Sequence, residues 1–115
     1  MRLPHWTFYV DEMKEPFVGR AFGPLIFIRK DWKEDKKLWL HEYEHVKQFY
    51  MTLFLHGLLY TFFRKYRIWA EARGYAAQTA DDKSNLATMG RRMALPVYDL
   101  RLTKEECRQE ILKYL

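Results

Sequence analysis

The sequence predicts a single α+β domain in which a small N-terminal antiparallel sheet precedes about four helices. Two β-rich runs lie within the first thirty residues, and glycines mark turns between them. Patterns that begin helices follow only after residue 30. A chain of 115 residues, of which 49% are hydrophobic and 17% aromatic, suits one modest packed core. We therefore treat residues 1–115 as one domain.

The strands are predicted from composition and the turns from glycine. Residues 6–10 (WTFYV) and 25–28 (LIFI) are rich in residues that favour strands. Gly19 and the Gly23-Pro24 pair mark the turns of the antiparallel sheet.

The helices are predicted from capping residues and breakers. Residues 31–34 (DWKE) resemble a capping box that begins a long helix, and Asp35 offers an alternative start. Residues 103–106 (TKEE) form a clearer capping box and predict a final helix to about Lys113. Residues 84–93 predict a short helix that ends before Pro96.

The first long helix carries the most informative pattern, HExxH, at His41-Glu42-Tyr43-Glu44-His45. The two histidines lie four residues apart, so both imidazoles project from one helical face. Zn²⁺ accepts imidazole nitrogens at about 2.0–2.1 Å, so this pair predicts two metal ligands. Glu42 projects about 100° further round the helix, beside the metal, where it can act as a general base.

A catalytic zinc site needs a third protein ligand. The extended form HExxHxxGxxH is excluded, because Gln48 and Met51 occupy its glycine and histidine positions. On one continuous helix, His56 would lie more than about 15 Å beyond His45, too far to bind the same ion. We therefore expect the third ligand to come from the next helix.

Glu71 is the predicted third ligand. Twelve residues of helix from His45 to Gly57 span about 18 Å, and fourteen from Gly57 to Glu71 span about 21 Å. If the chain reverses near Gly57, these similar lengths bring the Glu71 carboxylate level with the histidines. Asp81 or Asp82 could serve instead but overshoot by about 15 Å. The competing interpretation is that Glu71 is a surface carboxylate paired with a nearby arginine.

These residues together resemble the gluzincins, zinc peptidases in which the two histidines of HExxH and a glutamate from the next helix hold the metal. Residues 24–78 are most similar to the very small minigluzincins and to short phage or bacterial proteins with HExxHxxQ, here ending at Gln48. The resemblance covers about half of the chain and implies a zincin-like active-site helix and a peptide or protein substrate.

The resemblance also implies a substrate path and shows one departure. In gluzincins the substrate lies along the edge strand before the active-site helix, which here would be residues 23–29. Related enzymes often place an aspartate four residues after the metal glutamate to orient a histidine, but this chain has Tyr75 there. We expect Tyr75, one turn beyond Glu71, to be a hydrogen-bond donor to the transition state or simply a core residue.

Composition limits other functions. The single Cys107 permits no internal disulfide, and no apolar leader is visible at the N-terminus. We therefore expect a cytoplasmic protein, with phage origin or non-classical export as alternatives. The net charge of +5 is spread along the chain without a nucleic-acid motif, so we expect no nucleic-acid partner. Residues 49–63 are strongly apolar but too short to span a bilayer, and favour a buried hairpin over weak membrane-surface contact.

The sequence therefore predicts a zinc-dependent peptidase with metal ligands His41, His45 and Glu71, the general base Glu42, and Tyr75 as a further catalytic candidate. The main alternative is a non-catalytic, zinc-stabilised interaction or assembly module. A basic, amphipathic membrane-surface protein without a metal is a third class.

Overall fold

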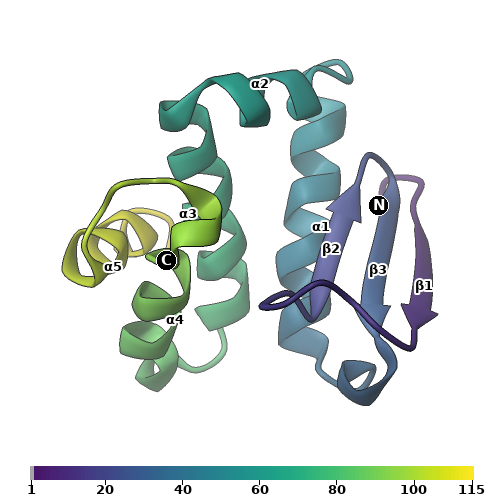
Figure 1. Cartoon of the computed structure of the whole chain (residues 1–115), viewed down its shortest axis with the longest axis horizontal. Helices are drawn as coiled ribbons and strands as arrows, with labels where there is room; N and C mark the ends of the chain where they lie inside the picture. The colour runs from purple at the N-terminus through teal and green to yellow at the C-terminus, as the bar shows by residue number, and fades with distance from the viewer. Residues whose placement is uncertain (1) are drawn as a thin grey trace.

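The computed structural model describes residues 2–115 and confirms the predicted α+β class. Figure 1 shows a layered arrangement: the sheet covers one side of α1, α3 runs beside the other side of α1, and α4 and α5 lie beyond α3. The elements in order are β1 (Trp6–Val10), β2 (Gly19–Phe22), β3 (Leu25–Arg29), α1 (Lys36–Met51), α2 (His56–Phe62), α3 (Arg64–Thr79), α4 (Leu86–Met93) and α5 (Lys104–Leu112), with 3₁₀ turns at Lys30–Trp32, Lys83–Asn85 and Pro96–Tyr98.

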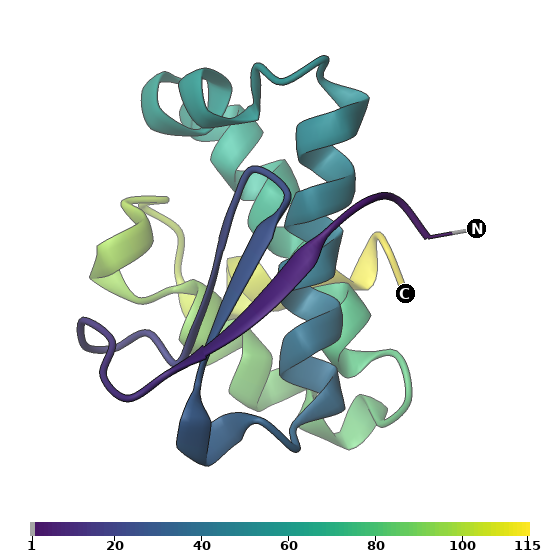
Figure 2. The same ribbon diagram turned by 90° about the vertical axis from the view of Figure 1, so that its right-hand side faces the viewer.

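The sheet is mixed rather than antiparallel, which corrects the prediction. Its strand order is β1-β3-β2, and β1 runs parallel to β3 whereas β2 runs antiparallel to it. The sequence prediction missed β2, which begins at the glycine taken as a turn marker. Because β3 is paired on both sides, the strand predicted to form the substrate edge is central, and β2 forms the edge instead. Figure 2 shows the sheet lying across α1.

α1 begins at the alternative start given by Asp35. The Asp35 carboxylate accepts a hydrogen bond of 3.0 Å from the backbone N–H of Leu38, as an N-cap does. The DWKE segment instead forms the 3₁₀ turn Lys30–Trp32. At the other end of the chain the predicted capping box of α5 is confirmed, since Thr103 and Glu106 bond each other's backbone N–H.

The reversal between the two long helices is more elaborate than a bend at Gly57. α1 ends at Met51, a turn follows, and the separate short helix α2 crosses the same end of both α1 and α3 (Figure 1). Gly57 lies inside α2 rather than at the turn. This extra element brings the number of α-helices to five, against about four predicted.

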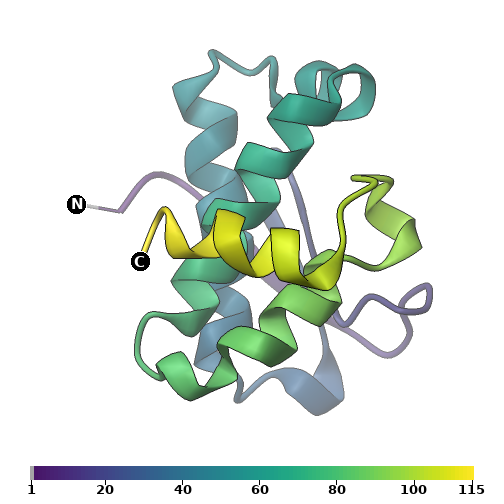
Figure 3. The same ribbon diagram turned by 90° about the vertical axis from the view of Figure 1, so that its left-hand side faces the viewer.

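A layer of buried polar residues separates two apolar clusters. Ile26, Ile28, Leu38 and Val46 form the cluster between the sheet and α1. The other cluster joins α3 to α4 and α5, which cross it in Figure 3. All buried polar or charged residues described lie on α1 or α3, namely His41, Glu42, Glu44, His45, Gln48, Glu71, Gln78 and Thr79. Such a layer is costly to bury, so its residues mark the candidate site.

Among residues 2–115, no helix combines the length and apolar character needed to cross a membrane.

Candidate metal centre

Three side chains predicted to bind a metal meet at the interface of α1 and α3. The Nε2 atoms of His41 and His45 are 3.2 Å apart. Glu71 Oε1 lies 3.3 Å from His41 Nε2, and Glu71 Oε2 lies 3.4 Å from His45 Nε2. These residues form the one group of potential metal ligands found in the described part of the chain, and all three are buried. Neither aspartate weighed as an alternative ligand, Asp81 or Asp82, belongs to it.

The spacing of these atoms fits a metal ion with short bonds. Two ligands held about 2.05 Å from a zinc ion at a tetrahedral angle lie about 3.3 Å apart, close to each of the three separations. Glu71 Oε1 is also buried without a hydrogen-bond partner among the described residues. A buried carboxylate oxygen rarely goes unpaired, and a metal ion would satisfy it. The group could therefore hold a metal, although its geometry alone does not select zinc.

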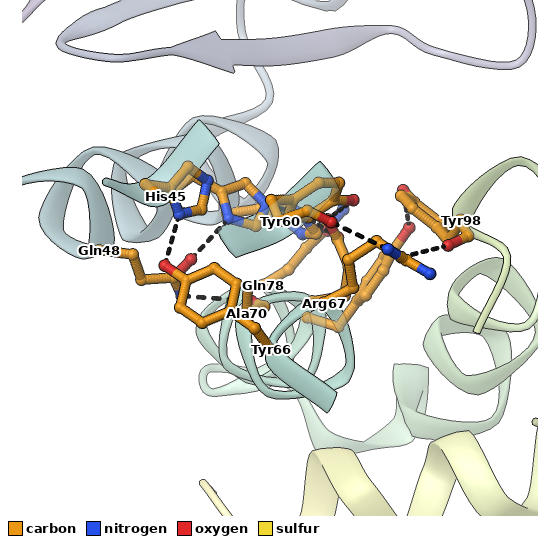
Figure 4. Close-up of polar contacts among 12 residues, drawn as sticks. His45, Gln48, Tyr60, Tyr66, Arg67, Ala70, Gln78 and Tyr98 are labelled. Carbon is orange, nitrogen blue, oxygen red and sulfur yellow. Dashed lines mark hydrogen bonds and ion pairs between the residues drawn. The ribbon is translucent and has the colours of Figure 1, made fainter. Parts of the chain in front are cut away.

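Two glutamines orient the histidines. The Nδ1–H of His41 donates to Gln78 Oε1 and the Nδ1–H of His45 donates to Gln48 Oε1, each at 2.9 Å. Gln48 is itself held by a bond from its Nε2 to the carbonyl of Ala70 (Figure 4). A neutral imidazole that donates from Nδ1 presents a lone pair at Nε2, so both lone pairs can point to one ion. The hydrogen bonds that orient both histidines therefore come from side-chain amides.

The third ligand has its own partner in α2. Tyr60 donates its hydroxyl to Glu71 Oε2 at 2.6 Å. This bond restrains one carboxylate oxygen and leaves the other free for a metal. The interpretation of Glu71 as a surface carboxylate paired with arginine is excluded, because Arg67 donates to the carbonyls of Tyr60, Thr61, Tyr98 and Asp99, and Arg73 pairs with Glu44 at 2.9 Å.

Glu42 lines the same cavity as the three potential ligands but stands apart from them. Burial raises the pKa of its carboxyl group above the ordinary value, and attraction to His41 and His45 offsets this only in part. Gly19 of β2 leaves room beside it, since a Cβ there would lie 3.2 Å from Glu42 Oε2. A carboxylate with a raised pKa beside a metal is suited to accept and return a proton.

The cavity has a volume of about 800 Å³ and reaches from the potential ligands to the edge strand. β2 and the hairpin turn after it line one side, and α2 together with Tyr98 lines the other. Arg67 ties these last two parts together through the carbonyls of Tyr60 and Tyr98 (Figure 4). The potential metal site is therefore open to a ligand of appreciable size.

His56 is the clearest residue that sequence reasoning missed. The exclusion of His56 assumed one continuous helix, whereas the break after Met51 folds α2 back over α1. The rings of His56 and His45 are 5.9 Å apart, and His56 Nδ1 is 2.6 Å from the hydroxyl of Tyr66. Burial, aided by His45, lowers the pKa of His56 to about 4, so the ring is neutral near pH 7. His56 belongs to the surroundings of the group and not to its ligands.

Tyr75 packs directly against a potential ligand, with its ring 4.4 Å from that of His41. Its hydroxyl is 2.7 Å from the hydroxyl of Tyr98, which lines the cavity. Both phenol pKa values are raised, chiefly by burial, so both groups keep their protons. The catalytic role of Tyr75 stays a prediction, and the pair makes Tyr98 a second candidate donor.

Charge is unevenly shared among the potential ligands. Burial opposes ionisation of Glu71, but attraction to His45 and His41 outweighs it, so the pKa of Glu71 is well below its usual range. Burial likewise opposes protonation of His45, yet the Glu71 carboxylate raises the pKa of His45 to about 9. Without a metal, His45 therefore carries a proton at neutral pH.

This proton should make metal affinity depend on pH. A metal must displace it, so we expect the apparent affinity to rise about tenfold per pH unit from near pH 7 and to level off above the His45 pKa of about 9. The stability of the metal-free protein should change in the opposite direction. Because the folded pKa exceeds the unfolded one, that contribution is complete below about pH 6.5 and is lost as pH rises through about 9. Competition titrations and denaturant melts at several pH values measure both trends, and an affinity that does not vary with pH would contradict them.

Gly74 lets α3 approach His41 closely. A Cβ added at Gly74 would lie 2.9 Å from His41 Nε2, so Gly74→Ala should displace the imidazole. We expect metal affinity to fall at least as much as the about 10–100-fold caused by losing an outer partner of a ligand. Gly57→Ala is the matched control, since a Cβ there meets nothing within 4 Å. Equal affinities in the two variants would show that this close approach does not matter.

Comparisons with protein-family models, with curated proteins and with solved structures each find no match. Functional inference for this chain therefore depends on the chemistry of the site itself.

Proposed function

We propose that this protein is a zinc-dependent peptidase in which His41, His45 and Glu71 hold the metal and Glu42 is the general base. One observation carries the proposal. Three buried side chains from two helices each offer one donor atom within 4.8 Å of the other two, and the carboxylate of Glu42 shares the cavity onto which they open.

The donor set favours zinc among common metals. Two imidazole nitrogens with one carboxylate oxygen make a borderline-soft site of the kind found in catalytic zinc centres. Magnesium and calcium prefer sites built only from oxygen. The orienting bonds from Gln48 and Gln78 add the outer support that such centres use.

The residues of the chain divide the work of hydrolysis. When bound, zinc supplies a Lewis acid for the scissile carbonyl and lowers the pKa of a nearby water. Glu42 takes the proton of the attacking water and delivers it to the leaving amine, a sequence that its raised pKa assists. Tyr98, held by Tyr75, offers a hydroxyl donor on the cavity side. Such a donor stabilises negative charge that develops on the carbonyl oxygen.

The edge of β2 suits an extended peptide. The backbone N–H of Arg29 donates to the carbonyl of Val18. In an antiparallel pair every second residue faces the partner strand, so the backbone polar groups of Arg20 and Phe22 also point toward β3. Gly19 and Ala21 consequently direct their N–H and C=O groups outward along the cavity wall. A peptide strand could pair with these groups and place its scissile bond beside Glu42.

A zinc-stabilised module without catalysis is the alternative. A structural zinc site is closed by four protein ligands, whereas a catalytic one keeps a position open. In residues 2–115 the group contains three potential ligands, and each of them lines the cavity. These features favour the peptidase.

The proposal is tested by digestion of casein, an unstructured protein, with mass spectrometry of the products. We expect zinc-loaded protein to release peptides, and protein stripped by a chelator to release none until zinc is restored. A chelator-stripped sample as active as the loaded one would contradict a metal-dependent mechanism.

A further inference from the structure

An apolar surface that adjoins the cavity of the proposed metal site, and shares Phe54 with it, covers one end of the molecule. Figure 1 shows this end, where α2 lies across the ends of α1 and α3. We call the surface the apolar cap, and its six side chains, each more than half exposed, are Leu53, Phe54, Leu55, Leu58, Phe62 and Phe63. Contiguous exposed apolar surfaces on proteins mark sites of interaction with another protein or with a membrane.

The cap arises because α2 is amphipathic with its apolar stripe outward. Leu55, Leu58 and Phe62 are spaced i, i+3 and i+7, so they lie on one side of the helix. No residue of α2 is buried. The opposite side carries His56 and Tyr60, which bond to Tyr66 and Glu71. Contacts with the metal site therefore fix the helix so that its apolar stripe faces away from the protein.

The turn before α2 presents further apolar residues in a strained conformation. Leu53 has a φ of 52° and Phe54 a φ of 72°, in the left-handed region that bulky residues seldom adopt. Leu53 is nevertheless 78% exposed, so core packing does not explain its presence there. Strained conformations of this kind cluster at functional sites. Leu53 projects into solvent, whereas the Phe54 ring also packs against Phe49 at 5.0 Å.

The segment that carries the cap contains basic residues but no acidic ones. Residues 45–70 contain Lys47, Arg64, Lys65 and Arg67 but no aspartate or glutamate. Lys47 pairs with Glu44, and Arg67 lies 3.9 Å from Asp99. Lys65, exposed next to the end of α2, and Arg64, whose Nε donates to the carbonyl of Leu100, form no ion pair with the described residues and make up the basic border of the cap. Apolar side chains bordered by lysine and arginine are typical of helices that lie in the plane of a membrane surface.

We propose that the apolar cap docks on an anionic membrane surface, with α2 lying in the interface and Arg64 and Lys65 at the level of the lipid headgroups. Charge decides between this partner and a second copy of the chain. In a symmetric pair the basic border of one cap would face the same border of the other without an acidic counterpart. Anionic headgroups attract the border instead. The proposal does not depend on the metal or on peptidase activity.

Vesicle flotation of the 115-residue chain tests the proposal. We expect strong binding to phosphatidylcholine vesicles that contain phosphatidylserine and much weaker binding to phosphatidylcholine alone. The double variant Leu58→Ser and Phe62→Ser should bind anionic vesicles roughly tenfold or more weakly, because it removes two large apolar groups. Lys65→Glu should weaken binding to anionic vesicles alone. The double variant Leu112→Ser and Leu115→Ser is the matched control, because these two exposed leucines lie at the end of α5 and after it, outside the apolar cap. It should bind vesicles as the wild type does.

A second readout alters only one of the six residues of the cap. Leu58→Cys can be labelled with an environment-sensitive dye, because the native Cys107 is fully buried. We expect a blue shift of the dye emission when anionic vesicles are added. Absence of binding, equal binding to both vesicle types, or unchanged binding of the cap variant would overturn the proposal. A dimer in sedimentation velocity that the cap variant abolishes would also overturn it, in favour of a contact between copies.

Discussion

Replacing Glu42 by glutamine should reduce peptide hydrolysis by about 10²–10⁴-fold, the loss typical of removing a general base. The amide keeps the size of the side chain but cannot accept a proton. Because Glu42 does not belong to the group of potential ligands, zinc content and fold should stay as in the wild type. Initial rates on an extended peptide, with both proteins matched for zinc, measure the effect.

Glu44→Gln is the matched control for this change, because it alters the other glutamate of the same motif. Glu44 is buried but pairs with Lys47 at 2.7 Å and Arg73 at 2.9 Å, away from the cavity. We expect Glu44→Gln to lower stability and to leave hydrolysis nearly unchanged. Equal nonzero rates for wild type and Glu42→Gln would indicate another base, whereas no hydrolysis by either protein would favour the zinc-stabilised module.

Removing a metal ligand should have the second large effect. We expect His41→Ala, His45→Ala and Glu71→Ala each to weaken zinc binding by more than the about 10–100-fold that loss of an outer hydrogen-bond partner costs. Each change removes one of three donor atoms that lie within 4.8 Å of one another. Competition titration against a zinc chelator of known affinity measures the loss, and circular dichroism checks that each variant is folded.

The aspartates weighed as alternative ligands provide the control. Asp82 caps the turn before α4 through Ser84, and Asp81 is not in the ligand group, so Asp81→Ala and Asp82→Ala should bind zinc as the wild type does. Retention of full affinity in Glu71→Ala, or its loss in either aspartate variant, would show that the third ligand has been misassigned.

Much of the site could be predicted because its spacing is local. His41 and His45 share a face through the helical repeat alone, and Glu71 is found by comparing the lengths of two antiparallel helices. The hydrogen-bond partners of the two histidines were harder to predict. Gln48 lies three residues after His45, so its proximity follows from the same repeat, whereas Gln78 approaches His41 only through the packing of α3 against α1.

The rest depended on chain direction and pairing, which local patterns do not encode. Nothing in the residues of β1 indicates that it pairs in parallel with β3, from which β2 separates it in the sequence. The apolar run through residues 49–63 looks like one hairpin of two helices, because the strained turn at Leu53 and Phe54 uses residues that do not signal a turn. For this reason the separate helix α2, and with it His56 and Tyr60 beside the site, could not be predicted.

A zinc titration of chelator-stripped wild-type protein, followed by hydrolysis of an extended peptide, tests the central claim most directly. If His41, His45 and Glu71 hold a catalytic ion, hydrolysis should rise in proportion to added zinc and reach its plateau at about one equivalent per chain, in keeping with a single group of three ligands. Protein that binds one equivalent of zinc and hydrolyses none of a varied set of peptides would contradict the claim.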